Sequence, residues 1–105
     1  MSWDAWLTDD RGHCDGEWNY THNVGRMLSV AAGIDASWYR MLNGMTGAEG
    51  AEFIDRTIKA LEAEPERFEA MNPKNGWGSY DGILTVLRKM RDAVPEWPTT
   101  WTACG

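Results

Sequence analysis

Two segments rich in amide and aromatic side chains offer the most chemistry in this sequence. The first covers residues 18–23, Trp-Asn-Tyr-Thr-His-Asn, and the second covers residues 72–80, Asn-Pro-Lys-Asn-Gly-Trp-Gly-Ser-Tyr. Amide groups, aromatic rings and free backbone N–H groups at a helix start are suited to binding a small polar ligand. The candidate ligand-binding residues are Asn19, Tyr20, His22, Asn23, Asn72, Asn75, Trp77 and Tyr80.

The same residue types also build tightly turned loops, and for Trp77 the structural interpretation is favoured. Gly76 and Gly78 supply positive φ angles in this interpretation, and Trp77 fills the core beneath the loop. In the alternative interpretation, Trp77 lies at the surface as a platform for a ligand. The two interpretations predict opposite exposures for this side chain.

The chain has two histidines and two cysteines, and no catalytic motif surrounds them. A phosphate-binding glycine loop, a nucleophile elbow and a paired-histidine metalloprotease helix are all missing from the sequence. The zinc-ligand types His13, Cys14, His22 and Cys104 follow no recognisable spacing. We therefore expect a protein that is not an enzyme, without a cofactor or a bound metal, and with two free thiols.

Length, charge and composition restrict the class of protein. The chain has 105 residues and a net charge of −6, which predicts one acidic domain over residues 1–105. No nucleic-acid partner is expected, because phosphate binding relies on clustered Lys and Arg. No apolar stretch is long enough to span a bilayer and no secretory signal is recognisable, so we expect no membrane partner and a cytoplasmic location.

Tryptophan is unusually abundant, with seven in the chain. A core of this size cannot enclose all of them, and each indole N–H needs a partner when it is buried. We therefore expect several tryptophans at the core boundary or in a groove.

The periodicity of apolar residues predicts an α+β fold. Alternation over residues 3–8 and 14–20 predicts an N-terminal hairpin, and the Thr- and Trp-rich segment 99–104 predicts a third strand beside it. Helical spacing follows after residue 21, after Ser37, after the capping box Thr46–Glu49, after Pro65 and after Ser79. We expect a small antiparallel sheet, made from the N-terminal hairpin plus the C-terminal strand, packed on three to four helices.

The two amide-rich segments also carry a resemblance. Residues 19–23 (Asn-Tyr-Thr-His-Asn), followed by residues 71–82 with Asn-Pro-Lys-Asn-Gly-Trp-Gly-Ser-Tyr, resemble a family of small proteins of actinobacteria and their phages. No activity is attached to that family. The resemblance implies a phage or prophage accessory product made in the host cytoplasm.

These observations lead to two expected functions. The first is non-enzymatic binding of a host protein by a phage-derived accessory protein, with the acidic stretch 49–69 and exposed tryptophans as contacts. The alternative is binding of a small ligand, a metabolite or nucleotide, between loops 19–23 and 72–80; such a protein needs a concave pocket lined by Asn19, His22, Asn75 and Trp77. An acidic mimic of nucleic acid is a third possibility.

Overall fold

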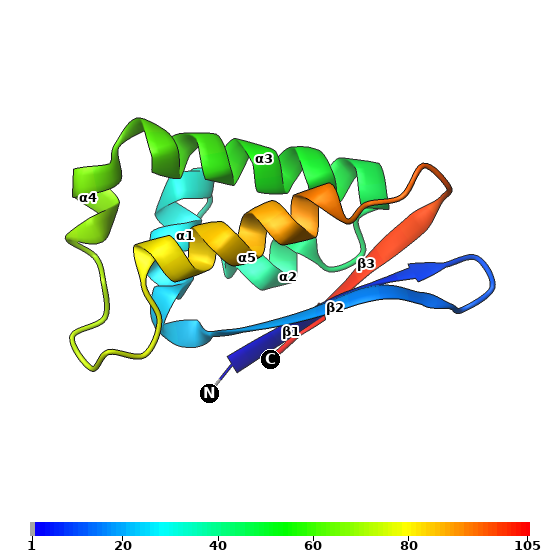
Figure 1. Cartoon of the computed structure of the whole chain (residues 1–105), viewed down its shortest axis with the longest axis horizontal. Coiled ribbons are helices and arrows are strands. Elements are labelled where there is room, and N and C mark those ends of the chain that lie inside the picture. The colour runs from blue at the N-terminus through cyan, green and yellow to red at the C-terminus, as the bar shows by residue number, and fades with distance from the viewer. Residues whose placement is uncertain (1) are drawn as a thin grey trace.

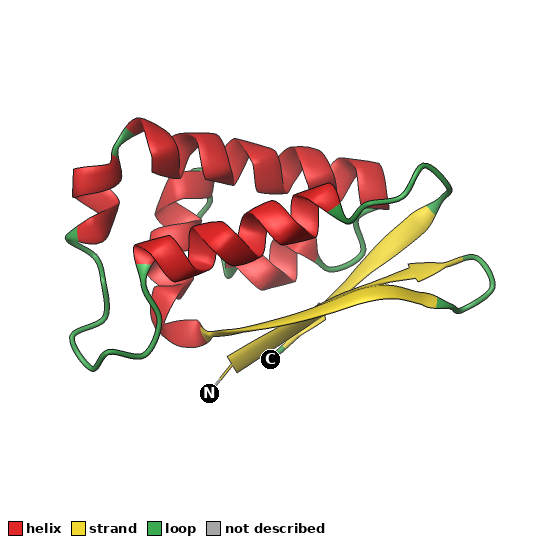
Figure 2. Cartoon of the chain, in the orientation of Figure 1, coloured by secondary structure: helices red, strands yellow, loops and turns green. Residues whose placement is uncertain are grey.

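The computed structural model describes residues 2–105, and within them it confirms the predicted α+β class. The helices all lie on one face of a three-stranded antiparallel sheet, and the opposite face of the sheet carries none of them (Figures 1 and 2). The elements in chain order are β1 (Ser2–Asp9), β2 (Cys14–Thr21), the 3₁₀ turn η1 (His22–Val24), α1 (Gly25–Ala32), α2 (Trp38–Leu42), α3 (Gly47–Ala63), α4 (Pro65–Glu69), α5 (Tyr80–Asp92) and β3 (Thr99–Cys104).

The sheet combines both ends of the chain, as the sequence predicted. Its strand order is β2-β1-β3, so the N-terminal strand is central and β3 pairs antiparallel with it, Leu7 opposite Trp101. The segment before α3 runs along the other side of β3, where the Trp101 N–H donates to the Met45 carbonyl at 2.8 Å. Cys14 and Cys104 lie on the two outer strands with β1 between them, and both thiols are free and exposed.

Alternation along β1 divides the sheet into a covered and an open face. Trp3, Ala5 and Leu7 are almost completely buried against the helices. Trp6 points to the open face and is only half-buried, with Glu17 and Thr102 as its neighbours on the adjacent strands. The period-2 pattern in the sequence therefore predicted which side chains enter the core.

The helix boundaries follow the capping residues. The Thr46 hydroxyl accepts from the Glu49 N–H at 3.2 Å and the Glu49 carboxylate accepts from the Thr46 N–H at 2.9 Å, which confirms the capping box. The Ser79 hydroxyl accepts from the Gly82 N–H at the start of α5. Pro65 separates α3 from α4 and occupies the first turn of α4, where a missing N–H costs nothing.

Tryptophan rings form the centre of the core. Trp3, Trp38 and Trp101 are each at most 2% exposed, and Trp38 lies 5.8 Å from Trp3 and 5.3 Å from Phe53 between ring centroids. Trp77 and Trp97, in contrast, are 70% and 55% exposed. Trp6 and Trp18 are half-buried, which confirms the expectation that several tryptophans lie at the core boundary. No helix within residues 2–105 has the length and apolar character to cross a bilayer.

Candidate functional site

The two amide-rich segments lie next to each other at the end of β2. They enclose a cleft of about 570 Å³, which we call the amide cleft, lined by Ser2, Asn19, Thr21, Asn23, Asn75 and Trp77. The register of the β1–β2 pair places Ser2 opposite Thr21, and these two residues form one wall of the cleft. Four of the eight predicted residues therefore share one cavity. Ser2 and Thr21 were not predicted, although the hairpin register could have placed them together.

Trp77 is exposed, so the prediction that it fills the core is wrong. The space beneath the loop is taken by Tyr80, which is 5% exposed and whose hydroxyl donates to the Leu61 carbonyl at 2.7 Å. Gly76 and Gly78 do have positive φ angles, 77° and 91°. These turns bring the loop against Thr21, whose methyl group would lie 2.5 Å from a Cβ at position 78.

Hydrogen bonds hold the cleft in its shape without using all of its polar atoms. Asn19 Nδ2 contacts oxygen atoms of Ser2, Trp3 and Asp4 at 2.9–3.2 Å. Asn75 Oδ1 accepts from the Trp77 N–H at 3.0 Å, and Asn23 Nδ2 donates to the Trp77 carbonyl at 3.4 Å. Oδ1 of Asn19, Oδ1 of Asn23 and Nδ2 of Asn75 have no hydrogen-bond partner within residues 2–105 and are available to a ligand.

Three other predicted residues support the cleft from behind. The Tyr20 hydroxyl accepts from the Ser79 N–H at 2.9 Å, and Asn72 Oδ1 accepts from the Tyr80 N–H at 2.7 Å. Burial, followed by the nearby Glu69 carboxylate, raises the pKa of Tyr80. These contacts fix the start of α5 and the 72–79 loop, so Tyr20, Asn72 and Tyr80 position the cleft and do not line it.

His22 was expected in the same pocket as Asn19 and Trp77, and the structure places it elsewhere. Its ring packs edge-on against Tyr39, with centroids 5.3 Å apart, and lines a separate pocket between α1 and α2. The four zinc-ligand types are not brought together either. Cys14 pairs with Thr8 near the hairpin turn, whereas Cys104 pairs with Asp4 nearer the other end of the sheet.

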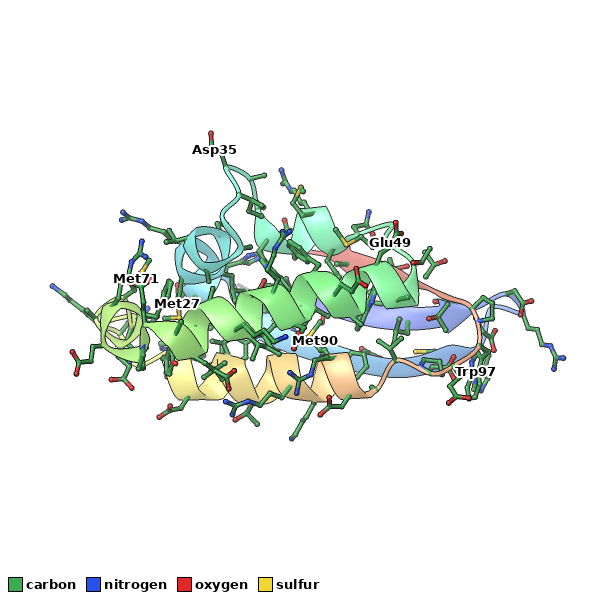
Figure 3. The ribbon with its side chains drawn as sticks, turned by 90° about the horizontal axis from the view of Figure 1, so that it is seen from above. Met27, Asp35, Glu49, Met71, Met90 and Trp97 are labelled. Atoms are coloured by element: carbon green, nitrogen blue, oxygen red, sulfur yellow. The ribbon has the colours of Figure 1, made fainter. Side chains whose placement is uncertain are left out.

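A different group of possible metal ligands occurs at the hairpin turn. Asp9, His13 and Asp15 each place a ligand atom within 4.8 Å of the others. The Asp9 carboxylate accepts the backbone N–H groups of His13 and Arg11, of which the His13 bond contributes most to lowering its pKa. Asp15 accepts the indole N–H of Trp97 at 3.2 Å, beside the strand ends at the right of Figure 3. These hydrogen bonds explain why the three side chains lie together: they stabilise the hairpin turn and its contact with Trp97.

The amide cleft is uncharged. Its described lining consists of amides, hydroxyl groups and one indole, with no Lys, Arg, Asp or Glu side chain. An aromatic ring beside amides is suited to a ligand that has one flat face and a polar edge.

Comparison of the chain with protein-family models, with curated proteins and with solved structures finds no match.

Proposed function

We propose that this protein is a non-enzymatic binding protein and that the amide cleft holds a small uncharged ligand. The observation that carries the proposal is the exposed indole of Trp77 on the wall of a cavity that also contains three asparagines. A ligand stacks one face on Trp77 and bonds its edge to the available atoms of Asn19, Asn23 and Asn75. Sugar rings and nucleobases share this chemistry.

The lack of charged side chains in the described lining of the amide cleft restricts the class of ligand further. Cationic side chains bind phosphate groups strongly, and none lines the described cleft. A nucleoside or a neutral sugar therefore fits the lining better than a nucleotide. The volume of about 570 Å³ lies within the range of small-molecule sites.

Replacing Trp77 distinguishes a role of this side chain in ligand binding from a role in folding. We expect Trp77→Ala to change the free energy of unfolding by less than about 0.5 kcal/mol, because the side chain is mostly exposed. Loss of one stacking partner lowers the affinity about tenfold or more. A panel of neutral monosaccharides and nucleosides, measured by thermal shift and then by calorimetry, provides the test.

Trp97→Ala is the matched control, since Trp97 is also exposed and lies beside the hairpin turn, away from the cleft lining. It should keep the affinity of the unsubstituted protein. Equal affinity for Trp77→Ala and the unsubstituted protein would refute the site. A panel without a single binder would refute the ligand class.

The open face of the sheet favours a second candidate, the binding of a host protein by a phage-derived accessory protein. Trp6 lies in the central strand, with Glu17 opposite it and Asp4 two residues before it on the same face. An apolar centre with acidic neighbours fits a partner that offers a pocket surrounded by Lys or Arg. The resemblance to proteins of actinobacteria and their phages supports a host partner of this kind.

Capture from an actinobacterial lysate distinguishes this surface from the amide cleft. We expect a partner that is retained by the unsubstituted protein and by Trp77→Ala, and lost with Trp6→Thr. Threonine is chosen because it favours strands and keeps β1 intact. A partner that Trp6→Thr retains as well as the unsubstituted protein does would contradict binding at the open face.

A further inference from the structure

A second pocket, separate from the amide cleft, lies beside η1. It has a volume of about 300 Å³ and shares no lining residue with the cleft. Its aromatic lining comes from Trp3 in β1, Trp38 and Tyr39 in α2, and His22 in η1, and its polar lining includes Arg26, Ser29 and Ser37. The volume is at the lower limit for small-molecule sites, which restricts the ligand to a compact molecule.

Trp3 brings an unused hydrogen-bond donor to this pocket. Among the three fully buried tryptophans, Trp38 donates its indole N–H to Thr57 Oγ1 at 3.1 Å and Trp101 donates to the Gly47 carbonyl at 3.4 Å. The indole N–H of Trp3 has no acceptor within residues 2–105, and although the residue as a whole is 1% exposed, this nitrogen is not one of the fully buried unpartnered atoms. The nitrogen therefore keeps contact with solvent at the pocket, and a ligand acceptor can take the place of the water that bonds it there.

Among the remaining polar groups named for this pocket, the Arg26 guanidinium is a donor only, whereas the hydroxyl groups can donate or accept. Arg26 is exposed at its edge and makes no ion pair with the described part of the chain. The Ser37 hydroxyl precedes α2 but does not cap it. The Ser29 hydroxyl already donates to the Ala36 carbonyl at 2.7 Å, and the Tyr39 hydroxyl accepts from Arg40 at 3.2 Å.

No Asp or Glu side chain is among the described residues that line this pocket. Asp35 is next to the lining residue Ala36 in the sequence, but its side chain points away from the protein at the tip of the α1–α2 loop (Figure 3). Arg26 therefore provides a positive charge that no lining acid neutralises.

We propose that this pocket binds a small organic carboxylate with a compact apolar body. The carboxylate accepts from the indole N–H of Trp3 and from the guanidinium of Arg26, which forms strong charge-assisted bonds with carboxylates. The apolar body packs among Leu28 and the rings of Trp38 and Tyr39. This site is independent of the amide cleft and of its proposed ligand.

Titration of benzoate into ¹⁵N-labelled protein tests the site directly, because each of the seven indole N–H groups gives its own NMR signal. We expect a saturable shift of the assigned Trp3 indole signal, larger than the shifts of the Trp38 and Trp101 signals. Benzamide has the same ring without the negative charge, and it should leave the Trp3 signal in place. Arg26→Gln should raise the Kd for benzoate about tenfold or more, and Arg26→Lys should raise it less.

Arg11→Gln is the matched control, because Arg11 is an exposed arginine at the hairpin turn that does not line the pocket. It should leave the benzoate Kd within about twofold, well below the tenfold change that marks a lost contact. Asn75→Ala should likewise leave it unchanged and thereby separate this site from the amide cleft. A Trp3 signal that does not respond to benzoate, equal responses to benzoate and benzamide, or an unchanged Kd in Arg26→Gln would each overturn the proposal.

Discussion

A chain ending at residue 98 is expected to lose its cooperative unfolding transition. This deletion removes β3, whose side chains Thr99, Trp101 and Ala103 are all at most 7% exposed. Truncating one buried tryptophan alone costs ~3–5 kcal/mol, and a small domain has only ~5–15 kcal/mol in total. The deletion also removes the backbone hydrogen bonds that join β3 to β1 and to the segment before α3.

Thermal unfolding followed by circular dichroism and by tryptophan fluorescence measures this effect. The deleted chain should show a broad, non-cooperative change in both signals. Deleting only Gly105, which is exposed and lies beyond β3, is the control and should preserve a sharp transition. If the chain ending at residue 98 melted as sharply and at the same temperature as the full chain, β3 would not be part of the stable sheet.

Gly50→Ala is expected to destabilise the protein by ~2–3 kcal/mol, the upper part of the range for overpacking a core. A Cβ atom at this position in α3 would lie 2.2 Å from the indole ring of Trp101, which is completely buried. The contact arises because α3 packs closely on β3 at this glycine. Alanine favours a helix over glycine by only ~1 kcal/mol, so the steric cost exceeds the gain in helix propensity.

Gly25→Ala is the matched control for this substitution. Gly25 begins α1 with helical φ and ψ angles of −57° and −44°, and a Cβ there meets no atom within 4 Å. This substitution should therefore stabilise the protein by ~0.5–1 kcal/mol. Urea denaturation measures the free energy of unfolding of both variants, which should fall for Gly50→Ala and rise for Gly25→Ala. A stabilising Gly50→Ala would show that α3 and β3 are not in the close contact described here.

Local sequence patterns determined the elements and the sheet. Alternation in residues 3–8 predicted the buried side chains of β1, and the Thr46–Glu49 pair predicted the start of α3, because both signals act within a few residues. The strand at residues 99–104 and its pairing with the N-terminal hairpin were also predicted correctly. Five α-helices occur in residues 2–105 where three to four were expected, because the short helices α2 and α4 each form a separate element.

The candidate sites were predicted only in part. The two amide-rich loops do meet, but the sequence did not show that Trp77 is exposed or that His22 lies in another pocket. Asn23 and Trp77 are 54 residues apart, and the side chain that takes the space below the loop, Tyr80, reaches a carbonyl 19 residues away.

Such contacts depend on how α3, α5 and β2 pack together, and no local periodicity encodes that packing. The sequence by itself determined the types and starts of the main elements and the face of β1 that enters the core, because capping and alternation are local. Only the tertiary structure decided which ring fills the space beneath the 72–79 loop, and therefore which indole remains free to bind a ligand.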